Sequence, residues 1–130
     1  MMTGFDTGFF VRLLQNVHEA VTIWKNVFEK ERAVISCLSL YELKKLALKG
    51  AIDSISMNRL LTNLPYVCEI IWLDNNDIVQ IGSNISHSFG LPSIDSLILA
   101  GFVKHKVMKI YTTDKHFKRY QKTGIKIILL

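Results

Sequence analysis

The order of apolar segments along the chain is the feature that most restricts its fold. Strand-length apolar runs alternate with segments of helical periodicity from one end of the sequence to the other. Strands are predicted at residues 1–5, 33–38, 67–73, 109–113 and 126–130, and helices at 7–14, 17–29, 39–49, 53–63, 77–89, 93–105 and 115–122. Such alternation is typical of a parallel sheet whose strands are joined by helices packed on both faces.

The predicted fold is therefore α/β, with three α/β/α layers around a mostly parallel sheet of five short strands. The 130 residues suit a single domain, 1–130, and 49% of them are hydrophobic, which is enough for a substantial core. No repeat or Pro-, Gly- or Ser-rich linker divides the chain. We expect Trp24, Phe28 and Trp72 in that core.

Charge and targeting signals limit the classes of function. Sixteen basic residues against eleven acidic ones give a formal net charge of +5, which favours polyanionic partners such as nucleic acid. The first residues lack the pattern of a secretory signal, and no apolar stretch approaches the roughly 20 residues of a membrane span. A cytoplasmic protein that does not enter a membrane is therefore expected.

The two cysteines have neither zinc-site spacing nor clustered histidine partners. Cys37 ends one predicted strand and Cys68 begins the next. If these strands are parallel neighbours, the sulfurs lie on the order of 13 Å apart at opposite ends of the sheet, too far for a disulfide. Two buried free thiols are predicted.

Four acidic residues are predicted near the carboxyl ends of the strands, where open parallel sheets bind ligands. Asp6 follows the first strand, and Glu42 lies one turn into the helix after the second. Asp95 opens the helix before the fourth strand, and Asp114 follows that strand. Each acid also has a structural explanation. Asp6 and Asp114 suit helix N-caps, Asp95 suits the positive end of a helix dipole, and Ser39 with Glu42 matches a capping box.

Carboxylates gathered at one edge of a sheet repel one another and raise each other's pKa values. A hard divalent cation removes that penalty, and Mg²⁺ and Mn²⁺ prefer carboxylate and water oxygens as ligands. Such a site activates water and neutralises charge on a phosphodiester. Together with the positive net charge, the four acids predict hydrolysis of a phosphate ester.

The four acids lie in short motifs that keep the order of a known family: Phe5-Asp6-Thr7, Ser39-Leu40-Tyr41-Glu42-Leu43, Ile94-Asp95-Ser96-Leu97-Ile98-Leu99-Ala100 and Tyr111-Thr112-Thr113-Asp114. In this order they resemble the PIN domain, and within it the VapC-type toxins of toxin–antitoxin pairs. The resemblance covers essentially the full length. Gly8 and Ser96 depart from the family pattern, which often has asparagine and alanine there.

The resemblance implies a PIN-like fold and a Mg²⁺- or Mn²⁺-dependent endoribonuclease. Asp6, Asp95 and Asp114 would hold the metal. Glu42 would bind metal or orient a water, and Thr112 would hydrogen-bond a water or an acid of the site. The family further implies an RNA substrate, a homodimer or higher homo-oligomer, and an antitoxin partner that wraps a groove between the early helices.

Basic residues near the acids have two explanations. They would anchor RNA phosphates beside the cut, or they would form solvated helix faces. Those on the helix of Glu42 and those after Asp114 are Lys44, Lys45, Lys49, Lys115, His116, Lys118, Arg119 and Lys122. The histidines have no metal-ligand spacing, and His116 is the one closest to a predicted site.

Three alternatives involve other activities. A receiver domain needs an acidic pair after its first strand, and a haloacid dehalogenase-like phosphatase needs an aspartate where Gly8 stands. The third is a non-catalytic PIN-fold module that binds RNA or a protein. The presence of all four acids argues against it.

Overall fold

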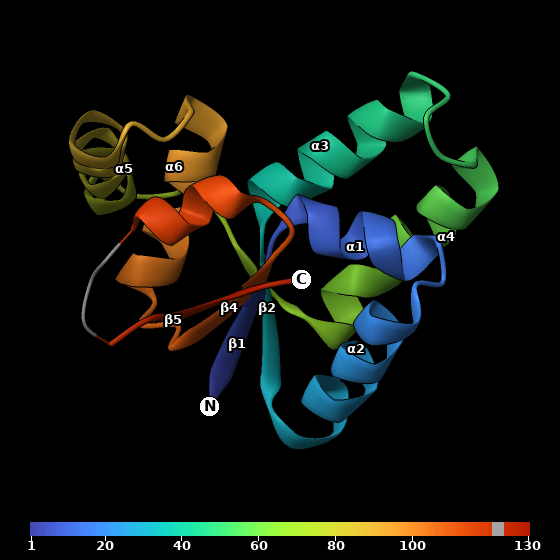
Figure 1. Cartoon of the computed structure of the whole chain (residues 1–130). Coiled ribbons are helices and arrows are strands. Elements are labelled where there is room, and N and C mark those ends of the chain that lie inside the picture. The colour runs from blue at the N-terminus through green and yellow to red at the C-terminus, as the bar shows by residue number, and fades with distance from the viewer. Residues whose placement is uncertain (121–123) are drawn as a thin grey trace.

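A sheet of parallel strands forms the centre of the computed structural model, which describes residues 1–120 and 124–130. Its strands are β1 (Met2–Phe5), β2 (Arg32–Ser36), β3 (Glu69–Ile71), β4 (Lys109–Thr112) and β5 (Lys126–Leu129). They pair in the order β3-β2-β1-β4-β5, and every neighbouring pair is parallel. The prediction of a parallel sheet of short strands is confirmed, and β1 lies in its middle (Figure 1).

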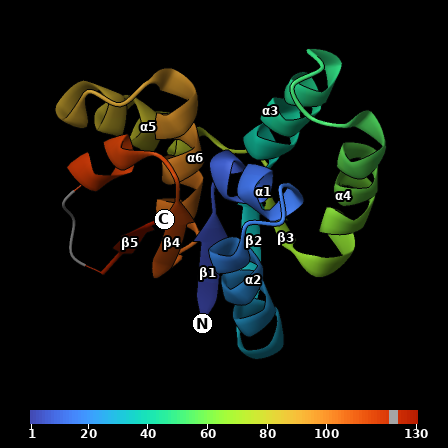
Figure 2. The same cartoon turned by 45° about the vertical axis from the view of Figure 1, so that its right-hand side comes forward.

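Helices cover both faces of this sheet. They are α1 (Thr7–Leu14), α2 (His18–Lys30), α3 (Cys37–Leu48), α4 (Ser54–Val67), α5 (Asn76–Phe89), α6 (Ser93–Lys104) and the 3₁₀ helix η1 (Lys115–Arg119). Figures 1 and 2 show α1 to α4 on one side and α5, α6 and η1 on the other, which confirms three layers. In the described part of the chain, no helix has the length and apolar character needed to cross a bilayer. The predicted helix 115–122 is shorter than expected, and Lys122 lies outside the described residues.

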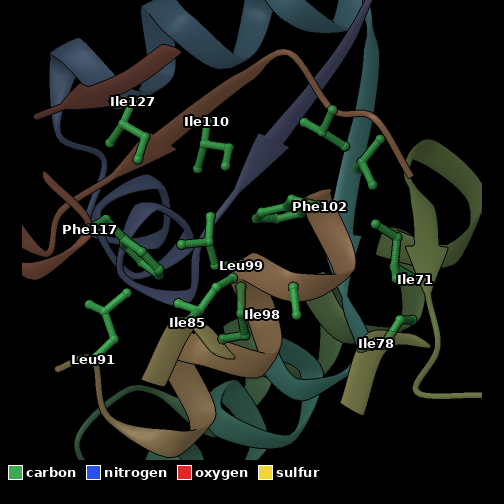
Figure 3. Packing of buried hydrophobic residues seen from close by; sticks show 13 residues of the cluster. Ile71, Ile78, Ile85, Leu91, Ile98, Leu99, Phe102, Ile110, Phe117 and Ile127 are labelled. Atoms are coloured by element: carbon green, nitrogen blue, oxygen red, sulfur yellow. The ribbon is translucent and has the colours of Figure 1, made fainter. Parts of the chain in front are cut away.

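One hydrophobic cluster fills the space between the sheet and α5, α6 and η1 (Figure 3). Ile110 of β4, Leu99 and Phe102 of α6, and Phe117 of η1 are almost completely buried in it. Phe102 packs directly on β1, where a Cβ added at Gly4 would lie 2.9 Å from its ring. Glycine at this position therefore lets α6 approach the central strand. The last turn of α6 is held against the central strand as a result.

A second cluster, rich in aromatic rings, lies on the opposite face under α1 to α4. Phe5, Phe9 and Phe10 are fully buried, and the Phe5 ring centroid lies 4.4 Å from that of Phe9 and 5.4 Å from that of Trp24. Burying each such side chain stabilises the fold by about 1.5–3 kcal/mol. Because Phe5 and Phe9 flank the junction of β1 and α1, their packing holds the backbone around Asp6 in one position.

The region around α4 and β3 differs from the sequence prediction. A helix ending before Pro65 and a strand over residues 67–73 are predicted, but α4 continues to Val67 and β3 is only three residues long. Pro65 removes one intrahelical hydrogen bond. The last turn persists because Leu64 is fully buried and its carbonyl accepts a hydrogen bond from the Cys68 amide at 2.8 Å.

Two aromatic residues lie outside the core in which they are predicted. Phe28 is 53% exposed at the end of α2, and Trp72 is 58% exposed just beyond β3. The prediction is wrong for both, because the neighbouring elements stop short of covering these positions. Trp24 is half-buried and packs against the aromatic cluster, as predicted.

The two cysteines are free and lie past opposite ends of neighbouring strands, as predicted. Cys68 is buried directly before β3, and burial raises the pKa of its thiol to about 12. Cys37 opens α3 and is half-buried. The prediction of two buried thiols is therefore correct for Cys68 alone.

Candidate active site

Acidic side chains meet where β1 and β4 end and where α3 and α6 begin. Phe5 of β1 pairs with Tyr111 of β4, and the Asp6 amide donates to the Tyr111 carbonyl at 3.2 Å. Asp6 consequently lies beside Thr112, the last residue of β4. Asp114 follows two residues later, while Glu42 lies on α3 and Asp95 in the first turn of α6. All are at the carboxyl edge of the sheet, as the strand order requires.

Asp6 is an N-cap and a buried carboxylate at the same time. It is only 4% exposed, and its Oδ1 accepts the Phe9 amide at 2.9 Å, which caps α1. Its Oδ2 accepts the Thr113 amide at 3.3 Å and the Thr112 hydroxyl. Burial raises the pKa of Asp6, these hydrogen bonds oppose the rise, and the charge of Asp114 adds to it. The pKa lies above its ordinary value as a net result.

Thr112 joins two of the acidic segments. Its side chain is completely buried, its hydroxyl donates to Asp6 Oδ2, and its oxygen accepts the Asp114 amide at 2.9 Å. Asp114 in turn caps η1, since its Oδ1 accepts the His116 amide at 2.8 Å. His116 Nδ1 lies 3.1 Å from the same carboxylate oxygen. One hydroxyl therefore links the carboxylate of Asp6 to the backbone of Asp114.

Glu42 is held by a contact that its sequence motif does not reveal. Ser36, and not Ser39, is the N-cap of α3, because its hydroxyl oxygen accepts the Leu38 amide at 3.1 Å. The capping-box interpretation of Glu42 is therefore wrong. The Thr7 hydroxyl instead donates to Glu42 Oε1 at 2.6 Å and lies 3.0 Å from Ser39 Oγ. Glu42 is thus oriented by a residue that directly follows Asp6.

Asp95 is the acid that the others influence most. Burial is the largest cause that raises its pKa, and the charge of Asp114 is the next. The charge of Glu42, a hydrogen bond with Asp114 and the charge of Asp6 add to these, and the pKa reaches about 6. The other three predicted acids therefore lie close enough to Asp95 to raise the pKa of its carboxyl group.

The sequence matches the family model described as PIN domain over residues 5–123. The chain belongs to the PIN domain family. No curated protein matches the sequence. Solved structures share the fold of this PIN domain at 16–21% identity.

Three of these structures contain toxin–antitoxin proteins. VapBC2 from Rickettsia felis, bound to a DNA fragment from their promoter, has a TM-score of 0.81 at 16% identity, covering 100% of this chain and 99% of that one. A toxin–antitoxin complex from Klebsiella pneumoniae has 0.76 at 21% identity, covering 97% and 95%. VapBC-1 from nontypeable Haemophilus influenzae has a TM-score of 0.76 at 19% identity, covering 99% of this chain and 98% of that one.

Gly8 of this PIN domain stands where many members have asparagine, and the structure gives a steric reason. A Cβ at this position would lie 1.8 Å from Thr113 Oγ1. That distance is far below contact, so a side chain at residue 8 and the observed position of the Thr113 hydroxyl exclude each other. The absence of a side chain at Gly8 therefore leaves the space that the Thr113 hydroxyl occupies beside Asp6.

The acids of the PIN domain form an anionic cluster and not a finished metal cage. Among the described residues, no three His, Cys, Asp or Glu side chains are placed to hold one ion. Mutual repulsion keeps carboxylates apart, although Asp95 and Asp114 are joined by a hydrogen bond. The donor set fits a hard cation, because it consists of carboxylate oxygens whose repulsion a cation relieves.

Basic residues near the cluster divide into two groups. Lys118 and Arg119 donate to main-chain carbonyls, of Ile127 at 2.8 Å and of Gly90 at 3.1 Å, and so support the fold. Lys44 donates to Asn58 at 3.3 Å. In contrast, Lys45 and Lys49 line a hollow together with Thr7 and Glu42. Of the predicted phosphate anchors, Lys45 and Lys49 therefore lie in a hollow beside Glu42, and His116 lies beside Asp114.

Proposed function

We propose that this PIN domain is a metal-dependent endoribonuclease, the toxin of a VapBC-type toxin–antitoxin pair, and that it acts in the cytoplasm as a single-domain protein. The observation that carries the proposal is the convergence of Asp6, Glu42, Asp95 and Asp114 at one sheet edge, close enough together that burial and the other three acids raise the pKa of Asp95 to about 6. Family membership supports it, as does the similarity to proteins of solved toxin–antitoxin complexes.

Each site residue has a role in this proposal. Asp6, Asp95 and Asp114 would hold Mg²⁺ or Mn²⁺, and Thr112 keeps the first and last of these at a set distance. Glu42, positioned by Thr7, would bind metal or orient the attacking water. When bound, the ion would acidify water and neutralise charge on the phosphodiester. The chain itself would supply the carboxylate oxygens and the hydrogen bonds from Thr7 and Thr112 that position them.

Metal dependence is the experiment that tests the proposal. The purified protein is expected to cleave a labelled RNA in Mg²⁺ or Mn²⁺. Cleavage is expected to stop when EDTA is in excess, because no cation is then left to activate water and to neutralise charge on the phosphodiester. Product bands on a denaturing gel measure the rate. An Asp77→Asn variant is the control for loss of an acid outside the site. Asp77 pairs with Lys104 at 2.7 Å on the surface, so this variant should cleave RNA at the wild-type rate.

The rival candidate is a non-catalytic PIN-fold module that binds RNA or a protein. It predicts equal RNA binding in Mg²⁺ and in EDTA, with no product in either. The raised pKa of Asp95 argues against it, because charge repulsion in the fold costs stability that a purely structural role would not require. Cleavage that continues undiminished in EDTA would contradict the metal mechanism itself.

An apolar groove between α1, α2 and α4 fits the antitoxin expected for such a toxin. Its volume is about 550 Å³, and its walls include Leu14, Trp24, Phe28, Leu60 and Val67. Phe28 is exposed at 53% and Val67 at 36%, so part of this apolar surface faces solvent. Exposed apolar grooves rimmed by polar residues are typical of protein-binding sites. We place an amphipathic segment of the antitoxin here.

A Phe28→Asp variant is expected to weaken binding of the antitoxin at least tenfold, because a charge replaces an aromatic anchor in the groove. The partner to test is the product of any short reading frame that directly precedes this gene, co-expressed with the toxin and measured by calorimetry. Leu48→Asp is the control, since Leu48 is 75% exposed and lies outside the groove. Equal affinity of both variants would remove the groove from the interface.

Self-association belongs to the same proposal. Trp72, Leu73 and Val79 are exposed apolar residues around the start of α5, at 58%, 43% and 43%. Such a surface suits contact between copies of the chain, as a homodimer or higher homo-oligomer. Light scattering during chromatography of the chain alone gives its mass and decides whether a single copy prevails.

A further inference from the structure

A hollow of about 300 Å³ lies beside the acidic cluster, between the start of α1, the part of α3 from Tyr41 to its C-cap Lys49, and the start of α6. Thr7 and Glu42 belong both to this hollow and to the candidate site. Its remaining walls are Tyr41, Lys45, Leu46, Lys49 and Ile94. A volume of this size is at the lower end of small-ligand pockets. It is large enough for one nucleotide but not for a folded domain.

The walls combine an aromatic face, apolar side chains and positive charge. Tyr41 is 56% exposed, although large aromatic side chains are usually buried. The Lys45 ammonium lies 5.8 Å from the Tyr41 ring centroid, near the outer limit of a cation–π contact. Leu46 and Ile94 add apolar surface. In the part of the chain that the structure describes, neither Lys45 nor Lys49 has a salt bridge to an acidic residue.

Single-stranded nucleic acid is the ligand that this combination of groups recognises. Unpaired bases stack on exposed aromatic rings, and nearby lysines contact the phosphates. A base inside a duplex is already stacked and paired, so it cannot present its face to Tyr41. An acidic peptide would satisfy the lysines but would bring no base to stack on the exposed ring of Tyr41.

We propose that this hollow is a subsite for one unpaired nucleotide of RNA next to the acidic cluster. The base stacks on Tyr41, while Lys45 and Lys49 bind the adjoining phosphate, so the phosphodiester bond beside this nucleotide lies at the four acids. The position of the cut bond rests on the proposed nuclease function, but binding of the nucleotide does not require cleavage. It makes strandedness at one position a determinant of where RNA is cut.

Binding in excess EDTA tests the subsite apart from any cleavage. The probe is an oligoribonucleotide of about eight nucleotides that carries one 2-aminopurine. Tyr41→Ala is expected to weaken binding about fivefold or more and to reduce the quenching of 2-aminopurine, while Tyr41→Phe retains both. Lys45→Ala is expected to weaken binding and to lower the slope of log Kd against log salt by about 0.7. Lys44→Ala, on the same helix but outside the hollow, is the matched control and should change binding less than twofold.

The outcomes separate the subsite from the nuclease proposal. If binding depends on Tyr41 and Lys45 but no metal supports cleavage, the subsite stands and the nuclease proposal fails. If metal-dependent cleavage occurs but Tyr41→Ala changes neither affinity nor KM, or Lys44→Ala and Lys45→Ala behave alike, the subsite is wrong. A probe with the same base locked in a hairpin stem should bind at least fivefold more weakly, and equal binding would also overturn the assignment. Tyr41 and both lysines are exposed, so these variants should fold, which circular dichroism verifies.

Discussion

Replacing Asp95 with asparagine is expected to abolish RNA cleavage while raising the melting temperature of the metal-free protein near neutral pH. The folded-state pKa of Asp95 is about 6, against an ordinary value of 3.8. The folded protein therefore holds this proton more tightly than the unfolded chain does. Its contribution to stability falls as pH rises from about 4 to 6 and stays low above that. Asparagine has no proton to lose and stays neutral at every pH, so it avoids the cost of a charged Asp95 in the folded protein.

The size of the effect follows from the same shift. With allowance for solvent around the half-buried carboxyl, the gain is about 1–2 kcal/mol, which raises the melting temperature by roughly 3–6 °C. Cleavage should fall at least about a hundredfold, because loss of one metal ligand removes several kcal/mol of transition-state stabilisation. Scanning fluorimetry in EDTA at several pH values and the gel assay measure the two effects.

Asp6→Asn provides the contrast that separates repulsion from general packing. It should lose cleavage equally, yet melt at a lower temperature than wild type. Burial raises the pKa of Asp6 as well, but the hydrogen bonds that this variant loses outweigh the relief of its charge. Asp6 accepts hydrogen bonds from Phe9, Thr112 and Thr113, and an amide would turn donor hydrogens toward one of these donors. Opposite signs for the two variants are the predicted signature. If Asp95→Asn has the same melting temperature as wild type at every pH, the four carboxylates do not repel one another in the folded protein.

Thr112→Val is expected to lower both stability and activity, although valine has nearly the same shape. The change removes the hydroxyl that donates to Asp6 and accepts the Asp114 amide, inside a fully buried site. Leaving these partners unsatisfied costs about 2–4 kcal/mol. Cleavage should decrease about 10- to 100-fold, as when other residues that orient metal ligands are removed.

Thr112→Ser tests the cause of that loss. Serine keeps the hydroxyl and removes only one methyl group, so it should retain most of the activity with a smaller drop in melting temperature. Urea unfolding and initial cleavage rates distinguish the two variants. If serine and valine are equally impaired, the methyl contact and not the hydroxyl positions the acids, and the proposed role of Thr112 is wrong.

The sheet and the positions of the four acids were predictable because both follow from local rules. Short apolar runs separated by helical patterns require a parallel sheet, and residues just past parallel strands must meet at one edge. Asp6 and Asp114 could therefore be placed near each other from the order of elements. Their metal-binding role remains a prediction, because it depends on side-chain geometry around an ion.

The errors arise where the outcome depends on distant partners. Ser39 and Glu42 match a capping box, but Ser36 begins the helix first and leaves Glu42 for Thr7, which is far away in sequence. Phe28 and Trp72 have core-like character, but whether a helix covers them depends on where α4 and β3 end. The hydrogen bond of Thr112 with an acid of the site was predicted, and the hydroxyl of Thr7 acts on Glu42 in the same way.

The two hydrophobic clusters lie on opposite faces of the sheet, and the acids draw on both. Glu42 extends from a helix anchored in the aromatic cluster, while Asp95 extends from a helix anchored in the other. The carboxylate spacing is thus set by how the outer layers sit on a shared middle layer. A cation bound here would connect the two outer layers, because its ligands come from helices on both faces of the sheet. A core substitution that shifts either layer relative to the sheet, even far from the acids, would therefore separate the carboxylates and weaken cation binding.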